Sequence, residues 1–311
     1  MATQSNESVT AYGVMTSKRA SVQSNSSLAA YGFMTPWMLG MLFLTLGSVL
    51  FSIYLAFTNY NLLSPAHFIG LQNFKQIFAN DPDFAASMRA TFLYVIISVP
   101  FRLVFALLVA VLLNRKVRGL GVYRALFYLP SLVGGSVGVS IGWRELFAPN
   151  GTINTLLQHV GINGPSWLAS PVDALLVLCL LSVWQFGSEM VIFLAGLKQI
   201  PKTYYEAASI DGASRFQQFM KVTLPMLSPI VFFNLVMGTI SAFMVFTQVY
   251  IITGGGPMNS TLFYVLYVYQ QAFTYYHMGY AAALSIILLI LIAACTGLLF
   301  LTQKYWVKYE N

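Results

Sequence analysis

Charged residues are scarce in this sequence of 311 residues. Asp, Glu, Lys and Arg together make up 8% of it, while 58% of the residues are hydrophobic. Soluble globular domains carry about 25% charged residues, so the composition excludes an ordinary water-soluble fold. The net charge of +7 does not indicate a nucleic-acid partner, because the basic residues lie between hydrophobic segments, where they set the orientation of a membrane protein.

Cysteine is almost absent. Cys179 and Cys295 each lie inside an apolar run without a partner at a metal-binding or disulfide spacing. Free cysteines of this kind are usually small buried residues. The three histidines, His67, His159 and His277, are far apart in the sequence, so neither a metal site nor a cofactor is expected on this chain.

A nucleotide-binding loop is also missing. Such a loop has the pattern Gly-x-x-x-x-Gly-Lys-Ser/Thr, and Lys202-Thr203 reproduces only its last two residues, directly after Pro201. No spaced pair of carboxylates or nucleophile and base stands out. The sequence therefore predicts a protein that is not an enzyme, and any ATP that drives it must be hydrolysed on another polypeptide.

Long apolar segments make up much of the sequence. A helix needs about 20 apolar residues to cross a bilayer, and six stretches qualify: Met34–Phe57, Ala90–Leu113, Ala125–Trp143, Ala174–Leu197, Met226–Ile252 and Met278–Leu301. The fold class is therefore an all-α polytopic membrane protein with six transmembrane helices in a domain of residues 34–303. Residues 1–33 are polar and resemble a disordered tail more than a signal peptide.

The connections between these spans carry unequal charge. Lys75 and Arg89 lie clear of the spans on one side, and twelve basic residues lie on the other: Lys18, Arg19, Arg115, Lys116, Arg118, Arg124, Lys198, Lys202, Arg215, Lys221, Lys304 and Lys308. The positive side of a membrane protein faces the cytoplasm. We therefore predict a multi-pass membrane protein with both termini cytoplasmic, including the segment 304–311.

The cytoplasmic connection 198–225 is polar and forms helices. A first short helix is expected after Pro201, which is well tolerated in a first turn. Asp211-Gly212 is typical of a turn, and Ser214 with Gln217 has the spacing of a capping box, with Asp211 as the alternative N-cap. Two such helices form a compact knob that either docks into a partner or lies on lipid headgroups, and the physical pattern does not choose between them.

The same connection carries a recognisable motif. Glu206-Ala207-Ala208, three residues, Gly212, nine residues and Val222-x-Leu224-Pro225 resemble the cytoplasmic signature of permease subunits of binding-protein-dependent ABC importers. The family usually has Ile where Val222 stands. Thr253-Gly254-Gly255-Gly256-Pro257 resembles the carbohydrate-importing branch of the maltose and glycerol-phosphate type, and lesser matches begin at Phe68, Phe127 and Ala195.

This resemblance implies a protein of the bacterial inner membrane that has the type I ABC importer permease fold with a cytoplasmic coupling-helix loop. The loop would sit in a cleft of an ATPase subunit and contact it through Glu206, Ala207, Ala208, Asp211, Gly212 and Phe216. The implied partners are a second homologous permease in a heterodimer, two ATPase subunits that bind Mg-ATP, and an extracytoplasmic solute-binding protein. Under this interpretation the outer loops Asn59–Arg89 and Phe147–Pro171 are the docking surface of the binding protein.

Two charged residues lie well inside predicted spans. Arg102 and Glu189 fall at comparable depths in the second and fourth spans, which run in the same direction. Charge in a membrane is costly and normally faces a bundle interior. The two side chains either form a structural ion pair, which we favour, or line a translocation path.

Uncharged polar residues gather in the fourth and fifth spans. Gln185 and Glu189 share a helix face, and Ser241 and Gln248 share another. A saccharide needs aromatic rings and hydrogen-bonding groups, so the candidate substrate path is Trp184, Gln185, Ser188, Glu189, Ser241 and Gln248. Each residue taken singly is equally typical of hydrogen bonding between membrane helices.

The leading hypothesis is therefore the permease subunit of an ATP-driven carbohydrate importer. The alternative is an ion-coupled secondary transporter or channel subunit, which predicts inverted repeats and acidic coupling sites in the membrane. The sequence shows no internal repeat and only Glu189 as an acidic residue deep in a span. A scaffold without transport activity would leave the 198–225 connection unexplained.

Overall fold

The computed structural model describes residues 31–114 and 119–308. The chain forms two compact units, Met1–Leu55 and Ala56–Asn311. The predicted tail 1–33 lies outside the described residues except for residues 31–33, as do the basic residues Arg115, Lys116 and Arg118. The predicted terminal segment 304–311 is described as far as residue 308.

The first unit holds one apolar helix. It runs over Tyr31–Ala56 and includes a π-helical segment η1 (Gly40–Leu46) followed by α2 (Gly47–Ala56). Its 26 residues are long and apolar enough to cross a membrane. The helix begins three residues before the predicted start at Met34.

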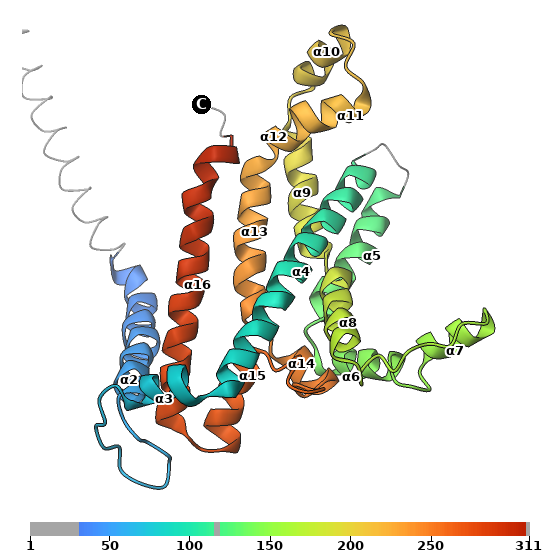
Figure 1. Cartoon of the computed structure of the whole chain (residues 1–311). Coiled ribbons are helices and arrows are strands. Elements are labelled where there is room, and N and C mark those ends of the chain that lie inside the picture. Colours follow the sequence, from blue (N-terminus) through green and yellow to red (C-terminus); the bar gives the residue numbers. More distant parts are fainter. Residues whose placement is uncertain (1–30, 115–118, 309–311) are drawn as a thin grey trace, which may run out of the picture. The chain divides into compact units, whose positions relative to one another are not determined.

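The second unit is built around one long helix, α4 (Pro82–Leu113). Asp81 caps its first turn by accepting a hydrogen bond from the Phe84 N–H at 3.0 Å, and Pro82 occupies the first helical position, where a missing N–H costs nothing. It contacts α8 (Pro171–Trp184), α9 (Gly187–Gln199), α13 (Ser228–Phe243) and α15 (Tyr264–Tyr269). Figure 1 shows it crossing the middle of this unit.

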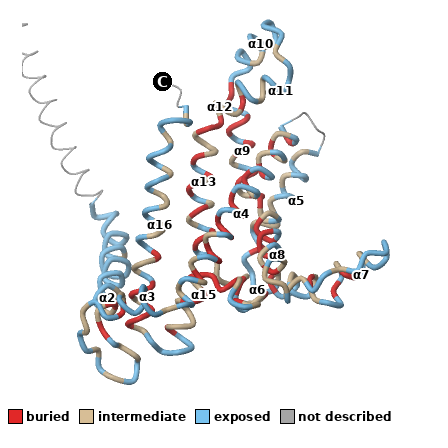
Figure 2. The backbone as a smooth tube through the Cα atoms, in the orientation of Figure 1, coloured by how far each residue is buried: buried red, intermediate tan, exposed pale blue. Residues whose placement is uncertain are grey.

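The remaining elements lie around this centre. They are α3 (Gln72–Asn80), α5 (Leu120–Val133), α6 (Val137–Leu146), α7 (Thr152–His159), α10 (Lys202–Ile210), α11 (Arg215–Gln218), η2 (Phe219–Thr223), α12 (Leu224–Met226), α14 (Thr247–Ile252), η3 (Gln270–Thr274) and α16 (Met278–Trp306). Buried residues concentrate on α4, α8, α9 and α13, whereas most of α16 is exposed or half-buried (Figure 2). The exposed apolar side chains of α16, such as Leu289 and Leu298, suit a lipid environment.

Three of the predicted spans are not continuous helices. The third is divided into α5 and α6, which meet at 97°, and the fourth into α8 and α9, which meet at 42°. The predicted fifth span, Met226–Ile252, contains α13, a non-helical turn at residues 244–246, and the short α14. A further bend of 64° separates the helical segment Arg215–Met226 from α13. Within the described residues, three helices are long enough to cross a membrane alone, and six crossings result only if the pairs bent at 97°, 42° and 64° each count as one span.

Local chemistry explains two of these breaks. At the first, the backbone turns at Gly134 and Gly135, and the Ser136 side chain then caps α6 by accepting from the Val139 N–H at 3.3 Å. At the second, Gly187 begins α9 directly against α5. A Cβ atom on Gly187 would lie 2.4 Å from the Phe127 carbonyl oxygen and 2.7 Å from the Tyr128 Cα, so only glycine permits this close approach.

We predict that Gly187→Ala lowers the stability of the protein. The added methyl group meets backbone atoms that cannot rotate away, and overpacking of this kind costs about 1–3 kcal/mol. Thermal unfolding in detergent, followed by size-exclusion chromatography, should show a lower midpoint. Gly142→Ala in α6 is the matched control, because no heavy atom lies within 4 Å of its Cβ position; an equal loss in both variants would contradict the packing argument.

Candidate functional site

A polar cavity of about 310 Å³ lies where the broken helices meet. Its walls come from α4, the α8–α9 break, α13 and the segment that leads into α14. All three breaks contribute to it, through Gly135, Gln185 and the turn at residues 244–246. A helix break leaves backbone groups without helical partners, and in a membrane protein such a break is tolerated where it is buried in protein or lines a cavity.

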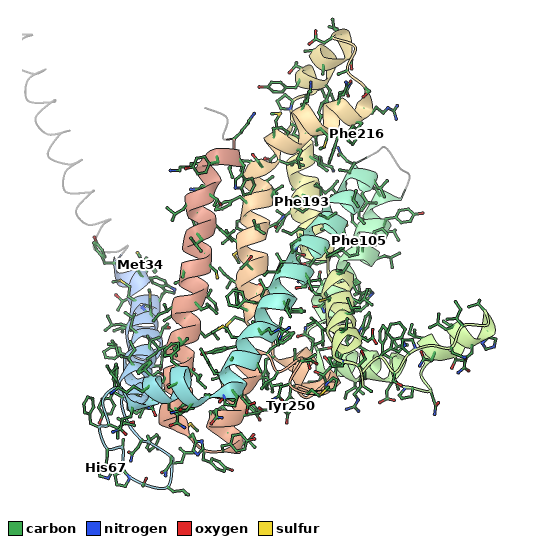
Figure 3. The ribbon with its side chains drawn as sticks, viewed as in Figure 1. Met34, His67, Phe105, Phe193, Phe216 and Tyr250 are labelled. Carbon is green, nitrogen blue, oxygen red and sulfur yellow. The ribbon has the colours of Figure 1, made fainter. Side chains whose placement is uncertain are left out.

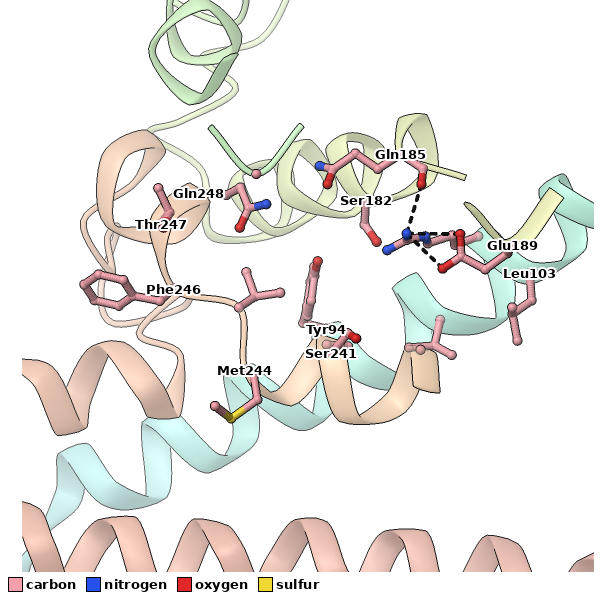
Figure 4. Close-up of a pocket in the computed structure, with 16 residues that line it drawn as sticks. Tyr94, Leu103, Ser182, Gln185, Glu189, Ser241, Met244, Phe246, Thr247 and Gln248 are labelled. Carbon is pink, nitrogen blue, oxygen red and sulfur yellow. Dashed lines mark hydrogen bonds and ion pairs between the residues drawn. The ribbon is translucent and has the colours of Figure 1, made fainter. Parts of the chain in front are cut away.

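An ion pair closes one side of this cavity. Arg102 of α4 and Glu189 of α9 approach to 2.8 Å, and their side chains are only 22% and 11% exposed. The same Arg102 nitrogen donates a hydrogen bond to the Gln185 carbonyl oxygen at 2.9 Å, at the point where α8 ends (Figure 4). Arg102 therefore neutralises Glu189 and also satisfies a carbonyl group that the helix break exposes.

The rest of the lining is uncharged. Hydroxyl and amide side chains are supplied by Tyr94, Ser182, Gln185, Ser241, Thr247 and Gln248, and apolar side chains by Val99, Leu103, Ala242, Met244, Val245 and Phe246. Figure 4 shows Tyr94, Ser182, Gln185, Ser241 and Gln248 around one space. With its one ion pair internally neutralised, the cavity offers hydrogen bonds and apolar surface to a ligand but no free charge.

Four of the six predicted path residues line this cavity, namely Gln185, Glu189, Ser241 and Gln248. Trp184 and Ser188 do not line it. The Trp184 ring instead packs against Trp143, with ring centroids 5.6 Å apart. Trp184 and Ser188 thus lie outside this cavity, whereas the other four predicted path residues line it.

The predicted face shared by Ser241 and Gln248 is also wrong. Ser241 belongs to α13 and Gln248 to α14, and the intervening turn separates the two helices. Both side chains nevertheless reach the cavity, because the turn folds back toward it. Ser241 and Gln248 thus line the same cavity from two separate helices.

Among the polar residues of the cavity, Tyr94, Ser182 and Thr247 were not in the predicted path. Tyr94 lies eight residues before Arg102 on α4, and Ser182 lies three residues before Gln185 on α8. Both spacings place side chains on one helix face. Helical spacing from Arg102 and Gln185 was the signal that would have found Tyr94 and Ser182.

A second candidate site is the helical module formed by residues 202–223. Asp211 ends α10, Gly212 has a φ of +74°, and Ser214 and Gln217 form the predicted capping box. Asp211 is therefore not the N-cap of α11. Glu206, Ala207 and Asp211 are exposed and Ala208 is half-buried.

Hydrogen bonds hold this module together. The Gln218 amide donates to the Ser209 hydroxyl at 3.1 Å and to the Ala213 carbonyl oxygen at 3.0 Å. The hydroxyls of Tyr205 and Thr223 are 2.9 Å apart. These contacts tie α10 to the helix that follows it, and the module keeps a defined shape.

The surface of the module exposes apolar side chains. Ile210 is 87% exposed, Phe216 71% and Met220 46%. Figure 3 shows Phe216 at the end of the second unit opposite Tyr250, which belongs to α14. Exposed apolar side chains on an otherwise polar module are typical of a surface that contacts a protein or a membrane.

Comparison with known proteins identifies the family. Residues 86–303 match the family described as binding-protein-dependent transport system inner membrane component, and the chain belongs to it. The chain is 52% identical over 280 residues to the probable ABC transporter permease protein YesP of Bacillus subtilis (strain 168), a match that covers 89% of this chain and 91% of YesP.

Two further similarities agree with this family. The lactose transport system permease protein LacF of Rhizobium radiobacter is 34% identical over 232 residues, covering 72% of this chain and 78% of LacF. A crystal structure of a bacterial alginate ABC transporter in complex with an alginate pentasaccharide-bound periplasmic protein contains a chain of the same fold. That chain matches with a TM-score of 0.78 at 20% identity, covering 92% of this chain and 98% of that one.

The protein is therefore a multi-pass membrane permease of an ABC transport system that works with a binding protein. Its fold is the type I importer permease fold expected from the sequence. The comparisons give no support to the alternative of an ion-coupled secondary transporter or channel.

We predict that Glu189→Ala destabilises the permease by leaving the Arg102 charge without its partner. Breaking a buried ion pair costs about 3 kcal/mol, whereas replacing both members with apolar residues is often tolerated. The double variant Arg102→Leu/Glu189→Leu should therefore unfold at a higher temperature than Glu189→Ala in the same detergent assay. A double variant no more stable than the single one would show that the unpaired charge is not the cause.

Proposed function

We propose that this chain is one permease subunit of an ATP-driven importer for a carbohydrate. The observation that carries this proposal is the neutral polar cavity at the three helix breaks. Sugars present hydroxyl groups and apolar C–H faces, and the cavity offers amides and hydroxyls beside the rings of Tyr94 and Phe246. Its volume of about 310 Å³ lies at the lower end of the range for ligand pockets, about 300–1,000 Å³.

The lactose permease relative supports this choice of substrate class. An uncharged sugar needs no counter-ion in the path, which agrees with the neutralised Arg102–Glu189 pair. Trp184 and Ser188 have no part in the proposed path, whereas Gln185, Glu189, Ser241 and Gln248 line it, together with Tyr94 and Ser182.

We further propose that ATP acts through the module at residues 202–223. Mg-ATP would bind two separate ATPase subunits, and one of them would hold the module through Glu206, Ala207, Ala208, Asp211, Gly212 and Phe216. The exposed Phe216 and Ile210 supply apolar contact area for this interface. A second, homologous permease would complete the path, and an extracytoplasmic binding protein would deliver the sugar to the opposite end.

The charge distribution supports an orientation with the module in the cytoplasm. Lys202, Arg215 and Lys221 belong to the module, and the end of α16 lies close to it in the fold, because the Lys308 N–H donates to the Ser228 hydroxyl at 2.8 Å. Lys75 belongs to α3, which lies at the opposite end of the second unit from the module (Figure 1). By the positive-inside rule, this distribution supports the proposal that both termini are cytoplasmic.

Transport by the reconstituted complex tests the proposed substrate class. Proteoliposomes that contain both permeases and the ATPase, with the binding protein outside, should accumulate carbohydrate only when ATP is present inside, and a protonophore should not stop the uptake. Uptake driven by an ion gradient without ATP would refute the proposal.

Within this assay, Ser241→Ala and Gln248→Ala should each reduce carbohydrate uptake about fivefold, because each removes a hydrogen bond worth about 1 kcal/mol. Ser188→Ala is the matched control, since Ser188 is half-buried on α9 and outside the cavity. Equal losses in Ser188→Ala and Ser241→Ala would contradict the assignment of the cavity as the sugar path.

For the coupling module, Gly212→Val should weaken retention of the ATPase on the purified permease at least tenfold, because valine is strained at a φ of +74°. Gly212→Asn should retain it, since asparagine tolerates this conformation. Glu206→Lys should also lose the ATPase, whereas Glu145→Lys, a charge-matched change on α6, should not. Full retention by Glu206→Lys and Gly212→Val in co-purification would remove the module from the interface.

A further inference from the structure

A second polar cavity lies at the end of the second unit opposite the module. It has a volume of about 550 Å³ and lies among the segment that leads into α3, α3 itself, the start of α4, α15, η3 and the start of α16. Figure 1 shows α3 and α15 at this end, with α10 and α11 at the other. Its lining consists of Asn59, Tyr60, Asn61, Asn73, Gln76, Asn80, Asp81, Asp83, Tyr267, Gln271, His277 and Tyr280. None of these residues lines the cavity at the helix breaks.

One wall of this second cavity is fixed by hydrogen bonds. The Asp81 carboxylate accepts hydrogen bonds from the hydroxyls of Tyr267 and Tyr280. The Gln271 amide donates to the Tyr267 hydroxyl at 3.1 Å, and its oxygen lies 3.0 Å from His277 Nδ1. Burial and the neighbouring Asp81 raise the pKa of Tyr267, so its hydroxyl stays protonated. The two tyrosine rings are held in place before any ligand arrives.

The other wall carries polar groups that are not engaged. The side chains of Gln76 and Asn80, both on α3, and the Tyr60 hydroxyl have no hydrogen-bond partner among the described residues. Each amide offers donors and an acceptor on the same group. Adjacent hydroxyls of a sugar ring need such paired donors and acceptors, and three tyrosine rings are available for its C–H faces.

The charges of the lining further restrict the class of ligand that this cavity can bind. It contains Asp81 and Asp83 but no Lys or Arg, which disfavours phosphates and uronic acids. A metal ion is also disfavoured, because the Asp81 oxygens already accept from Phe84 N–H and the two tyrosines, and Asp83 accepts from the Asn259 amide at 2.8 Å. No group of three or more His, Cys, Asp or Glu side chains gathers in the described part of the chain.

We propose that this second cavity is an extracytoplasmic binding site for neutral saccharides, separate from the cavity at the helix breaks. The side chains of Gln76, Asn80 and Tyr60 bind the sugar hydroxyls, and the wall built on Asp81 presents the rings of Tyr267 and Tyr280 to it. The inference rests on the proposed carbohydrate transport for its substrate class and its orientation. It adds a place where a saccharide is held at the surface, before it reaches the path.

A glycan array provides the test. The complex of both permeases and the ATPase, in nanodiscs and without the binding protein, is applied to immobilised neutral oligosaccharides and oligouronates. We expect binding to neutral glycans, and the strongest of these then serves for measuring Kd. The double variant Gln76→Ala/Asn80→Ala should raise this Kd at least tenfold. Both side chains are exposed, so the variant should keep the thermal stability of the parent.

Two control variants separate this site from its surroundings. Gln72→Ala removes an exposed amide from the same helix but outside the cavity, and Ser188→Ala removes a hydroxyl that lies outside both cavities. Neither should change the Kd. The inference is overturned if no neutral glycan binds, if oligouronates bind more tightly, or if Gln76→Ala/Asn80→Ala leaves the Kd unchanged.

The uptake assay distinguishes this inference from the proposed function. A complex that binds neutral glycans through Gln76 and Asn80 but accumulates no carbohydrate would refute the proposed transport and leave the binding site standing. Carbohydrate uptake by a complex whose glycan binding is unaffected by Gln76→Ala/Asn80→Ala would retain the transport function and remove the second site.

Discussion

The need to satisfy backbone polar groups inside a membrane determines where this chain can depart from a helix. Each exposed N–H or C=O group costs several kcal/mol in hydrocarbon, so helix breaks are confined to places where protein or a cavity surrounds them. In this permease the breaks at Gly134–Ser136, Gln185–Phe186 and residues 244–246 all adjoin one cavity. The polar cavity therefore exists because the helices are interrupted around it, and the breaks are tolerated because they line the cavity.

Arg102 shows how the freed groups are accommodated. Its guanidinium reaches from the unbroken α4 to the Gln185 carbonyl oxygen at the end of α8 and to the Glu189 carboxylate on α9. It thus joins both halves of a bent span to the central helix. A charged arginine inside a membrane costs free energy, and these two acceptors offset that cost. Because Glu189 also neutralises the arginine, the cavity beside it carries no net charge. The ion pair favoured from the sequence is confirmed as a contact, and it also borders the cavity.

Sequence patterns predicted the membrane class, the positions of the apolar segments and the capped turn of the module, because each depends on local chemistry. They predicted none of the breaks. Gly134-Gly135-Ser136 and Gly187 mark the breaks in the third and fourth spans, but Met244-Val245-Phe246 contains no glycine, proline or polar residue. That turn is set by tertiary packing, and Phe246 lies against the rings of Tyr250 and Tyr269.

The hydrogen bonds that fix the shape of the module involve other side chains than those on its exposed apolar surface. Hydrogen bonds among Gln218, Ser209, Tyr205 and Thr223 hold the module together from within. The side chains of Ile210 and Phe216, in contrast, are mostly exposed. Under the proposed function, a few surface side chains would therefore determine which ATPase the permease accepts, and they could change while the membrane-embedded part stays the same.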